Sequence, residues 1–258
     1  AACSQLWNLR GYQNTPVAAC ATGTIAIGEA YDAIRFGRAS MLLAGAGESL
    51  NSVCAIWNID VLGALSRETE SPERASCPFS LQRSGFVLSE GGAVLCLEER
   101  ESALARGATI LAEVTGYANF SDAVDFTSPA EDCVAREQTI RWALRGADLQ
   151  PADLDYINAH GTSTPLNDLN ETQSLKKALG DEAYRIPISS TKAYSGHLIA
   201  AAGSFETIVC LQAMAAGILP ATAHLTQPDP QCDLDYIAEG HRQGEIHRAL
   251  NLSFGLDR

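Results

Sequence analysis

Short apolar runs alternate along the chain with segments in which apolar residues recur every three to four positions. The first pattern is typical of buried strands and the second of helices packed on one face. Regular alternation of the two favours an α/β fold. Helices are predicted at 24–36, 102–106, 134–146, 169–179 and 197–217, and strands at 14–20, 40–47, 85–88, 92–98, 110–117, 154–157, 186–189, 234–237 and 249–254.

Cys20 lies where the first predicted strand gives way to the helix 24–36. A thiol at a helix N-terminus meets unpaired N–H groups and the positive end of the helix dipole, both of which favour the thiolate. The same N–H groups could hold an oxyanion. A small buried cysteine in a core turn explains this segment equally well.

Two histidines follow predicted strands. His160 ends the strand 154–157 and opens a loop rich in hydroxyl groups, and strand ends are where ligands bind in α/β sheets. His197 follows the strand 186–189 and begins an alanine-rich helix that is apolar on nearly every face, so we expect this helix to be buried. A histidine at a buried helix N-terminus favours the neutral imidazole, which donates a hydrogen bond without being an acid. Either histidine alone could be structural, but together with Cys20 they indicate a reactive site.

The motifs around these three residues resemble those of the β-ketoacyl-acyl-carrier-protein synthases. Cys20 lies in Ala-Cys-Ala-Thr-Gly, His160 in Asn-Ala-His-Gly-Thr-Ser-Thr-Pro-Leu-Asn-Asp and His197 in Gly-His-Leu-Ile-Ala-Ala-Ala-Gly. The resemblance covers residues 9–255 and is closest to the elongating type II enzymes of fatty-acid and polyketide synthesis. It implies a thiolase-like fold of duplicated αβαβα layers. The second histidine argues against the thiolases and the chain-initiating synthases.

The resemblance also implies a chemistry. Cys20 would take an acyl group from the phosphopantetheine arm of a carrier protein, and a malonyl-carrier protein would then lose carbon dioxide and attack the thioester. His160 and His197 would donate Nε2–H bonds to the enolate oxygen, where charge builds up. No metal or organic cofactor is expected. Further roles are implied for Lys192 and Glu171 in orienting the histidines, for Thr162 and Thr164 in holding pantetheine, and for Phe254 and Leu256 at a gate.

Some assignments have alternatives or depart from the family pattern. Lys192 and Glu171 could instead form a structural ion pair. At the C-terminus, Leu256 takes the position of the gating phenylalanine, and Asp257 and Arg258 replace two glycines that permit positive φ. The N–H of Leu256 could still complete the oxyanion hole. Because Asp257 and Arg258 do not share the conformational freedom of glycine, we expect the gate to differ from the family pattern in its motion and its position.

The units around Cys20 and His197 share one plan, in which a strand and a tight turn precede a reactive residue and a long helix. We therefore expect residues 1–107 to be the remainder of an N-terminal thiolase-like half and residues 108–258 to be the C-terminal half. Nineteen residues precede Cys20, so several strands of the first half are expected to come from another chain or from a longer polypeptide. A buried sheet with open edges favours aggregation, and we do not expect residues 1–258 to fold alone.

Composition adds limits on partners and location. A formal net charge of −13 disfavours nucleic acid as a partner. It is also awkward for binding an acidic carrier protein. Arg35 with Arg38, or Lys176 with Lys177, could form a local basic site, but a solvated helix face is the preferred interpretation of each pair. Eight cysteines without paired spacing suggest a reducing cytoplasm. The apolar stretches are expected to be too short to span a membrane. A homodimer, or a heterodimer with a related subunit, is expected from the resemblance.

Three functions remain open from the sequence. The favoured one is an elongating ketosynthase. The second is a non-condensing partner subunit, such as a chain-length factor, which usually lacks the nucleophile that Cys20 would provide. The third is a relative that only decarboxylates or transfers acyl groups.

Overall fold

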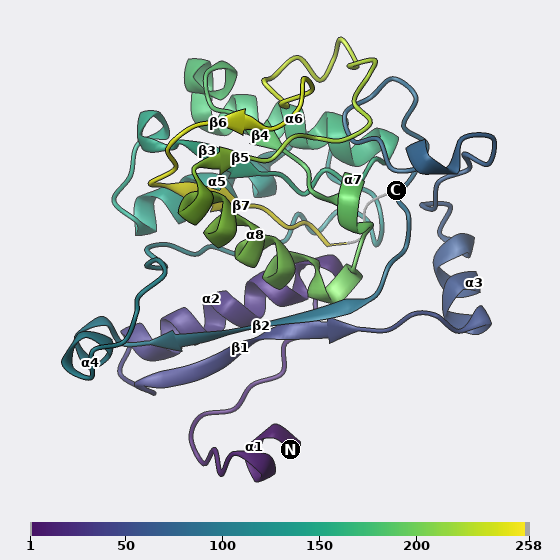
Figure 1. Ribbon diagram of the computed structural model, residues 1–258. Helices are drawn as coiled ribbons and strands as arrows, with labels where there is room; N and C mark the ends of the chain where they lie inside the picture. The colour runs from purple at the N-terminus through teal and green to yellow at the C-terminus, as the bar shows by residue number, and fades with distance from the viewer. Residues whose placement is uncertain (1, 256–258) are drawn as a thin grey trace.

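The computed structural model describes residues 2–255 as an α/β fold (Figure 1). Short 3₁₀ turns occur at Ala19–Ala21, Pro72–Arg74, Pro151–Asp153, Gly180–Tyr184 and Ile199–Ala201. The helices are α1 (Ala2–Leu6), α2 (Thr22–Arg35), α3 (Val53–Val61), α4 (Arg100–Ala105), α5 (Val134–Gly146), α6 (Pro165–Leu179), α7 (Lys192–Ser195) and α8 (Ala202–Ala216). The strands are β1 (Met41–Glu48), β2 (Gly91–Glu98), β3 (Tyr156–Asn158), β4 (Ile188–Ser189), β5 (Ile218–Leu219), β6 (Arg242–Gln243) and β7 (Ala249–Asn251).

Strands β1 and β2 form a long antiparallel pair whose register runs from Met41 opposite Glu98 to Glu48 opposite Gly91. Alternate side chains point to opposite faces. Ala44 and Leu97 on one face pack against α2. The opposite face exposes apolar side chains, including Leu43 and Val94.

A second sheet has the order β4-β3-β7 with parallel pairing. Ile157 on β3 belongs to a core shared with Ile140 of α5 and Leu175 of α6. Its neighbour Tyr156 points to the other face and packs with Cys210 of α8. The sheet therefore separates the α5 and α6 helices from α8.

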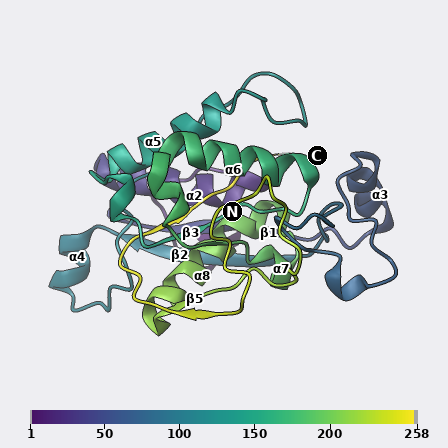
Figure 2. The same ribbon diagram turned by 90° about the horizontal axis from the view of Figure 1, so that it is seen from above.

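Figure 1 shows α2 and α8 side by side between the two sheets. They approach closely because Gly203 faces α2: a Cβ there would come within 1.9 Å of the Thr24 hydroxyl oxygen, and one at Gly23 within 2.7 Å of the Ser204 nitrogen. The described part of the chain thus has four layers, in the order α5 and α6, the β4-β3-β7 sheet, α8 and α2, and the β1-β2 pair. Seen from above, α3 stands apart from these layers (Figure 2), and none of its residues is buried.

Several predicted elements differ from the structure. The predicted strands 14–20, 110–117 and 234–237 form no strand, and 85–88 makes only isolated bridges through Phe86 and Leu88. Val17 and Leu111 in the first two runs are exposed, whereas the run 234–237 is mostly buried, and none of these runs pairs with a neighbouring strand among the described residues. The short strands β5 and β6 were not predicted. The helix expected to begin at His197 begins at Ala202, after the turn Ile199–Ala201.

The expectation about apolar stretches also needs correction. Residues Ile199–Ala216 are long and apolar enough to cross a membrane by length and composition, with a mean hydropathy of 1.5. In this fold the segment is a core helix, because it packs against α2 and carries the buried, ion-paired Glu206. Only 44% of the segment is buried, so α8 is less enclosed than its composition predicted.

Candidate active site

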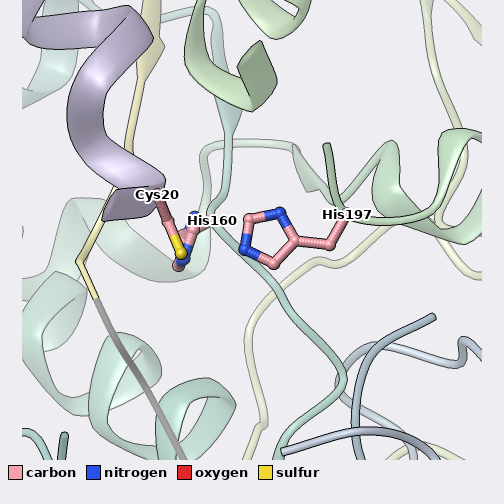
Figure 3. A group of neighbouring side chains, drawn as sticks. All are labelled: Cys20, His160 and His197. Atoms are coloured by element: carbon pink, nitrogen blue, oxygen red, sulfur yellow. The ribbon is translucent and has the colours of Figure 1, made fainter. Parts of the chain in front are cut away.

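Cys20, His160 and His197 meet in one place (Figure 3). The Cys20 sulfur and one ring nitrogen of each histidine all lie within 4.8 Å of one another. All three side chains are buried, with at most 5% exposed. The two imidazole rings are 5.4 Å apart between centroids and nearly perpendicular. The structure thus brings together three residues that are separated by up to 177 positions in the chain, 20 to 197.

Cys20 occupies the middle of the 3₁₀ turn that leads directly into α2. Ala19, just before it, has a positive φ of 45°, which aims the turn back toward the helix. The turn is closed by a hydrogen bond from the Ala21 N–H to the Ala18 carbonyl oxygen (3.0 Å), and the Ala18 N–H donates to the Thr22 hydroxyl (2.9 Å). The thiol therefore lies at the N-terminal end of α2, where the helix dipole favours negative charge.

His160 follows the end of β3, and its backbone is held by Glu171 of α6. The two Glu171 carboxylate oxygens accept from the N–H of His160 (2.7 Å) and from the N–H of Gly161 (2.8 Å). Glu171 is fully buried. Its carboxylate therefore fixes the backbone of the loop that carries the imidazole.

His197 is held through its backbone and through one side of its ring. Its backbone N–H donates to the Val87 carbonyl oxygen (2.7 Å), and its ring Nδ1 accepts from the Ile199 backbone N–H (3.2 Å). An Nδ1 that accepts a hydrogen bond carries no proton, so the neutral ring has its proton on Nε2. Among the residues that the structure describes, none accepts from this Nε2. The proton is available to a substrate oxygen.

Both imidazoles are held neutral. Burial lowers the pKa of His160 well below its ordinary value, and the charges of Lys192 and Arg136 act in the same direction, as would a proton on His197. Burial, followed by the charge of Lys192, does the same for the pKa of His197. The neutral state predicted for His197 thus arises from desolvation and from a lysine.

Lys192 and Glu171 do not pair with each other. The Lys192 ammonium donates to the carboxylate of Glu206 on α8, and both side chains are 1% exposed. Glu206 is therefore a residue of the site that the sequence interpretation missed. It is the one charged residue in the apolar segment of α8, and this isolated charge is the feature of the sequence that could have identified it.

Thr162 and Thr164 lie in the loop after His160, with their hydroxyl oxygens 2.9 Å apart. Ser163 between them has a φ of 68°, and its N–H donates to the Asp168 carboxylate (3.2 Å). Asp168 also accepts from the Phe79 N–H (2.8 Å), so one buried carboxylate ties two loops together. Burial raises the pKa of Asp168 to about 6, against the effect of these donors.

A small pocket opens over the three residues. Thr162 reaches its wall, whereas Thr164 does not. Phe254 borders the site through His160, with ring centroids 5.8 Å apart, and Leu256 lies outside the described residues. The remaining wall is largely apolar and consists of Ile59, Leu62, Ala64, Phe86, Thr127 and Ile199. None of these six was singled out as a site residue from the sequence.

One thiol and two imidazoles are ligand types that zinc uses. The geometry of His197 does not suit that role. A neutral imidazole bound to a metal through Nε2 carries its proton on Nδ1, which would then face the Ile199 N–H, donor against donor. The arrangement fits a nucleophile beside two hydrogen-bond donors better than it fits a metal centre.

We expect Glu171→Gln to flatten the dependence of stability on pH. Burial raises the pKa of Glu171 to about 7, above the ordinary value of 4.5. Its contribution to stability is therefore largest below pH 4.5 and is lost as the pH rises to about 7, a span on the order of 3 kcal/mol. Urea unfolding at both ends of this range measures the slope. The exposed Glu245→Gln serves as the control, and an unchanged slope in Glu171→Gln would contradict the prediction.

Comparison with known proteins places this site in a family. Residues 1–103 match the N-terminal domain model of β-ketoacyl synthases, and residues 111–226 match the C-terminal domain model. The 3-oxoacyl-[acyl-carrier-protein] synthase 2 of Synechocystis sp. is 43% identical over 246 residues, covering 95% of this chain and 59% of that protein. A putative polyketide β-ketoacyl synthase 1 of Streptomyces halstedii is 42% identical over 252 residues, covering 98% and 60%.

Solved structures agree. A type II polyketide synthase acyl-carrier protein in complex with its ketosynthase bound to the hexaketide matches with a TM-score of 0.96 and 40% identity, over 99% of this chain and 63% of that chain. The ishigamide ketosynthase/chain length factor matches with a TM-score of 0.86 and 32% identity. The chain spans about three fifths of the length of the curated relatives that it matches. The fold is that of the thiolase-like ketosynthases, and the chain belongs to the β-ketoacyl synthase family.

Proposed function

We propose that this chain carries the reactive centre of a β-ketoacyl-acyl-carrier-protein synthase, which elongates fatty-acid or polyketide chains. One observation supports this most directly: a thiol at a helix N-terminus and two neutral imidazoles meet in a buried, largely apolar pocket. The Nε2–H of His197 has no acceptor among the described residues, so it can donate to a ligand oxygen.

In the first step, the Cys20 sulfur attacks the carbonyl carbon of an acyl thioester on the phosphopantetheine arm of a carrier protein. The new C–S bond to Cys20 forms as the bond to pantetheine breaks, and the departing thiolate takes up the proton that Cys20 releases. Thr162 at the pocket wall is placed to hydrogen-bond a pantetheine amide.

In the second step, a malonyl thioester loses carbon dioxide, and the electron pair of the broken bond forms an enolate. Negative charge then builds up on the thioester oxygen, where His160 and His197 donate hydrogen bonds. The enolate carbon attacks the Cys20 thioester, and the Cys20 sulfur leaves. The products are a β-ketoacyl carrier protein, carbon dioxide and the free enzyme.

The partners and location follow from this proposal. The substrates arrive on an acyl carrier protein, and the chain acts as part of a homodimer or of a heterodimer with a related ketosynthase subunit, in the cytoplasm. A non-condensing subunit of the chain-length-factor type is the second candidate, since one structural relative pairs a ketosynthase with such a factor. Cys20 favours the condensing role, because it supplies a nucleophile next to two donors.

Intact mass after incubation with an acyl-carrier-protein thioester tests the proposal. We expect one acyl adduct on the wild type, none on Cys20→Ala, and an unchanged adduct on Cys77→Ala, which removes another buried thiol. A folded wild-type protein without an adduct would favour the non-condensing subunit. Acylation without a β-ketoacyl product from a malonyl donor would favour a relative that only transfers acyl groups.

A further inference from the structure

Arg136 on α5 is a buried arginine to which the proposed chemistry gives no role. Its side chain lies beneath the site, and the residue is 8% exposed. The guanidinium Nη1 donates to the Asn167 side-chain oxygen at the start of α6 (3.0 Å). Ordering and desolvating a charged group in a protein core costs several kcal/mol, so its contacts must offset that cost.

Arg136 also contacts the ring of Phe254. The guanidinium carbon lies 4.1 Å from the centre of the Phe254 ring. Such a cation–π contact is favourable, and more so when it is desolvated, as it is here. It holds the aromatic ring from the side of α5.

Phe254 in turn contacts His160. The two ring centroids are 5.8 Å apart, and the planes meet at 88°, an edge-to-face arrangement. The three side chains thus form a continuous series of contacts from Arg136 through Phe254 to His160. Its last member faces the Cys20 sulfur.

We propose that Arg136 is a positioning residue for His160: its guanidinium holds Phe254, and Phe254 sets the orientation of the imidazole that faces Cys20. The proposal rests on the proposed role of His160 beside the nucleophile. It also explains why the residue is an arginine, because a planar guanidinium stacks flat on a ring while one of its N–H groups donates to Asn167, whereas the compact ammonium of lysine has no plane to stack. The charge of Arg136 additionally disfavours protonation of His160.

Alkylation of Cys20 by iodoacetamide, followed by peptide mass mapping, tests this proposal without a carrier protein. The variants are Arg136→Lys, which keeps the charge, and Arg136→Met, which keeps an unbranched apolar chain. We expect both to alkylate Cys20 about tenfold more slowly than the wild type, because a displaced neutral imidazole no longer donates a hydrogen bond that stabilises the thiolate. The control is Arg145→Met, since Arg145 lies over the exposed Trp142 ring on the same helix at 5.1 Å, and we expect its rate to stay within about twofold of wild type.

The buried Cys77 in the same samples reports on general loosening. Loosening exposes thiols and speeds the alkylation of both cysteines, whereas loss of positioning slows Cys20 alone. Phe254→Leu should slow Cys20 to a similar degree, and adding Arg136→Met to it should slow the reaction no further. A wild-type rate in Arg136→Lys, or faster alkylation of Cys20 together with Cys77, would overturn the proposal.

These outcomes are separate from the proposed function. If the wild-type Cys20 is alkylated readily but no condensation product forms, the ketosynthase assignment fails while the Arg136 comparison still stands. If Arg136→Met does not fold, Arg136→Lys decides the question on its own, because full rescue by lysine contradicts stacking.

Discussion

Replacing His197 with leucine is expected to lower the rate of condensation about 10²–10³-fold, the usual cost of losing one donor to a developing oxyanion. The substitution removes the Nε2–H that has no acceptor among the described residues. Acylation of Cys20 should fall far less, because the enolate forms only in the second step. A radiolabelled malonyl donor measures condensation, and intact mass measures acylation.

His241→Leu is the matched control for this experiment. The Nδ1 of His241 accepts from the Ala221 N–H (3.1 Å), as that of His197 accepts from Ile199, but His241 lies outside the pocket. Equal losses in both variants would show that the backbone contact matters and the donor does not. In the wild type, the lowered pKa of both site histidines predicts that condensation persists until the pH falls well below 6.5.

Lys192→Met is expected to reduce the free energy of unfolding by about 3–5 kcal/mol, because it leaves the carboxylate of Glu206 buried without its cation. Burial raises the pKa of Glu206, and loss of Lys192 raises it further. The loss should therefore be smaller at acidic pH, where Glu206 is protonated at lower cost, than at neutral pH. Urea unfolding at two pH values measures both effects.

The double variant Lys192→Met with Glu206→Leu should recover much of the lost stability, since it removes both charges. Lys176→Met is the exposed counterpart, because Lys176 pairs with Asp233 at the surface, and we expect it to cost less than about 1 kcal/mol. A loss in Lys192→Met no larger than that in Lys176→Met would show that the buried pair contributes little to folding.

The long helices were predictable from the sequence, and so were strands β1, β2, β3, β4 and β7, whereas four other apolar runs predicted as strands are not strands in the structure. Helix α5 was predicted with the bounds that the structure shows, because helical periodicity is local. The strands of the β4-β3-β7 sheet are only two or three residues long. The apolar run 234–237 is buried but pairs with no strand among the described residues. Pairing depends on distant segments, which the local pattern does not contain. The division into halves at residue 107 stays a prediction.

The candidate site was predicted at the level of motifs. Cys20, His160 and His197 could be named from their motifs, and the structure brings them together. The contacts around them could not be named, because they depend on the fold: Glu171 holds two backbone N–H groups, and Lys192 reaches Glu206 on another helix. A motif shows which residues are present and does not show which partner each of them meets.

The left-handed backbone at Ala19, Ser163 and Ile199 has a consequence for how this protein tolerates change. Ala19 directly precedes Cys20, Ser163 lies between the two threonines, and Ile199 follows His197 by two positions. Each of these backbone conformations costs about 1–3 kcal/mol for a residue with a Cβ. The fold thus gives up stability at the same loops that present its reactive groups. Glycine at these positions would remove the local backbone strain and raise the stability of the protein. It would also let the thiol and the imidazole move out of alignment.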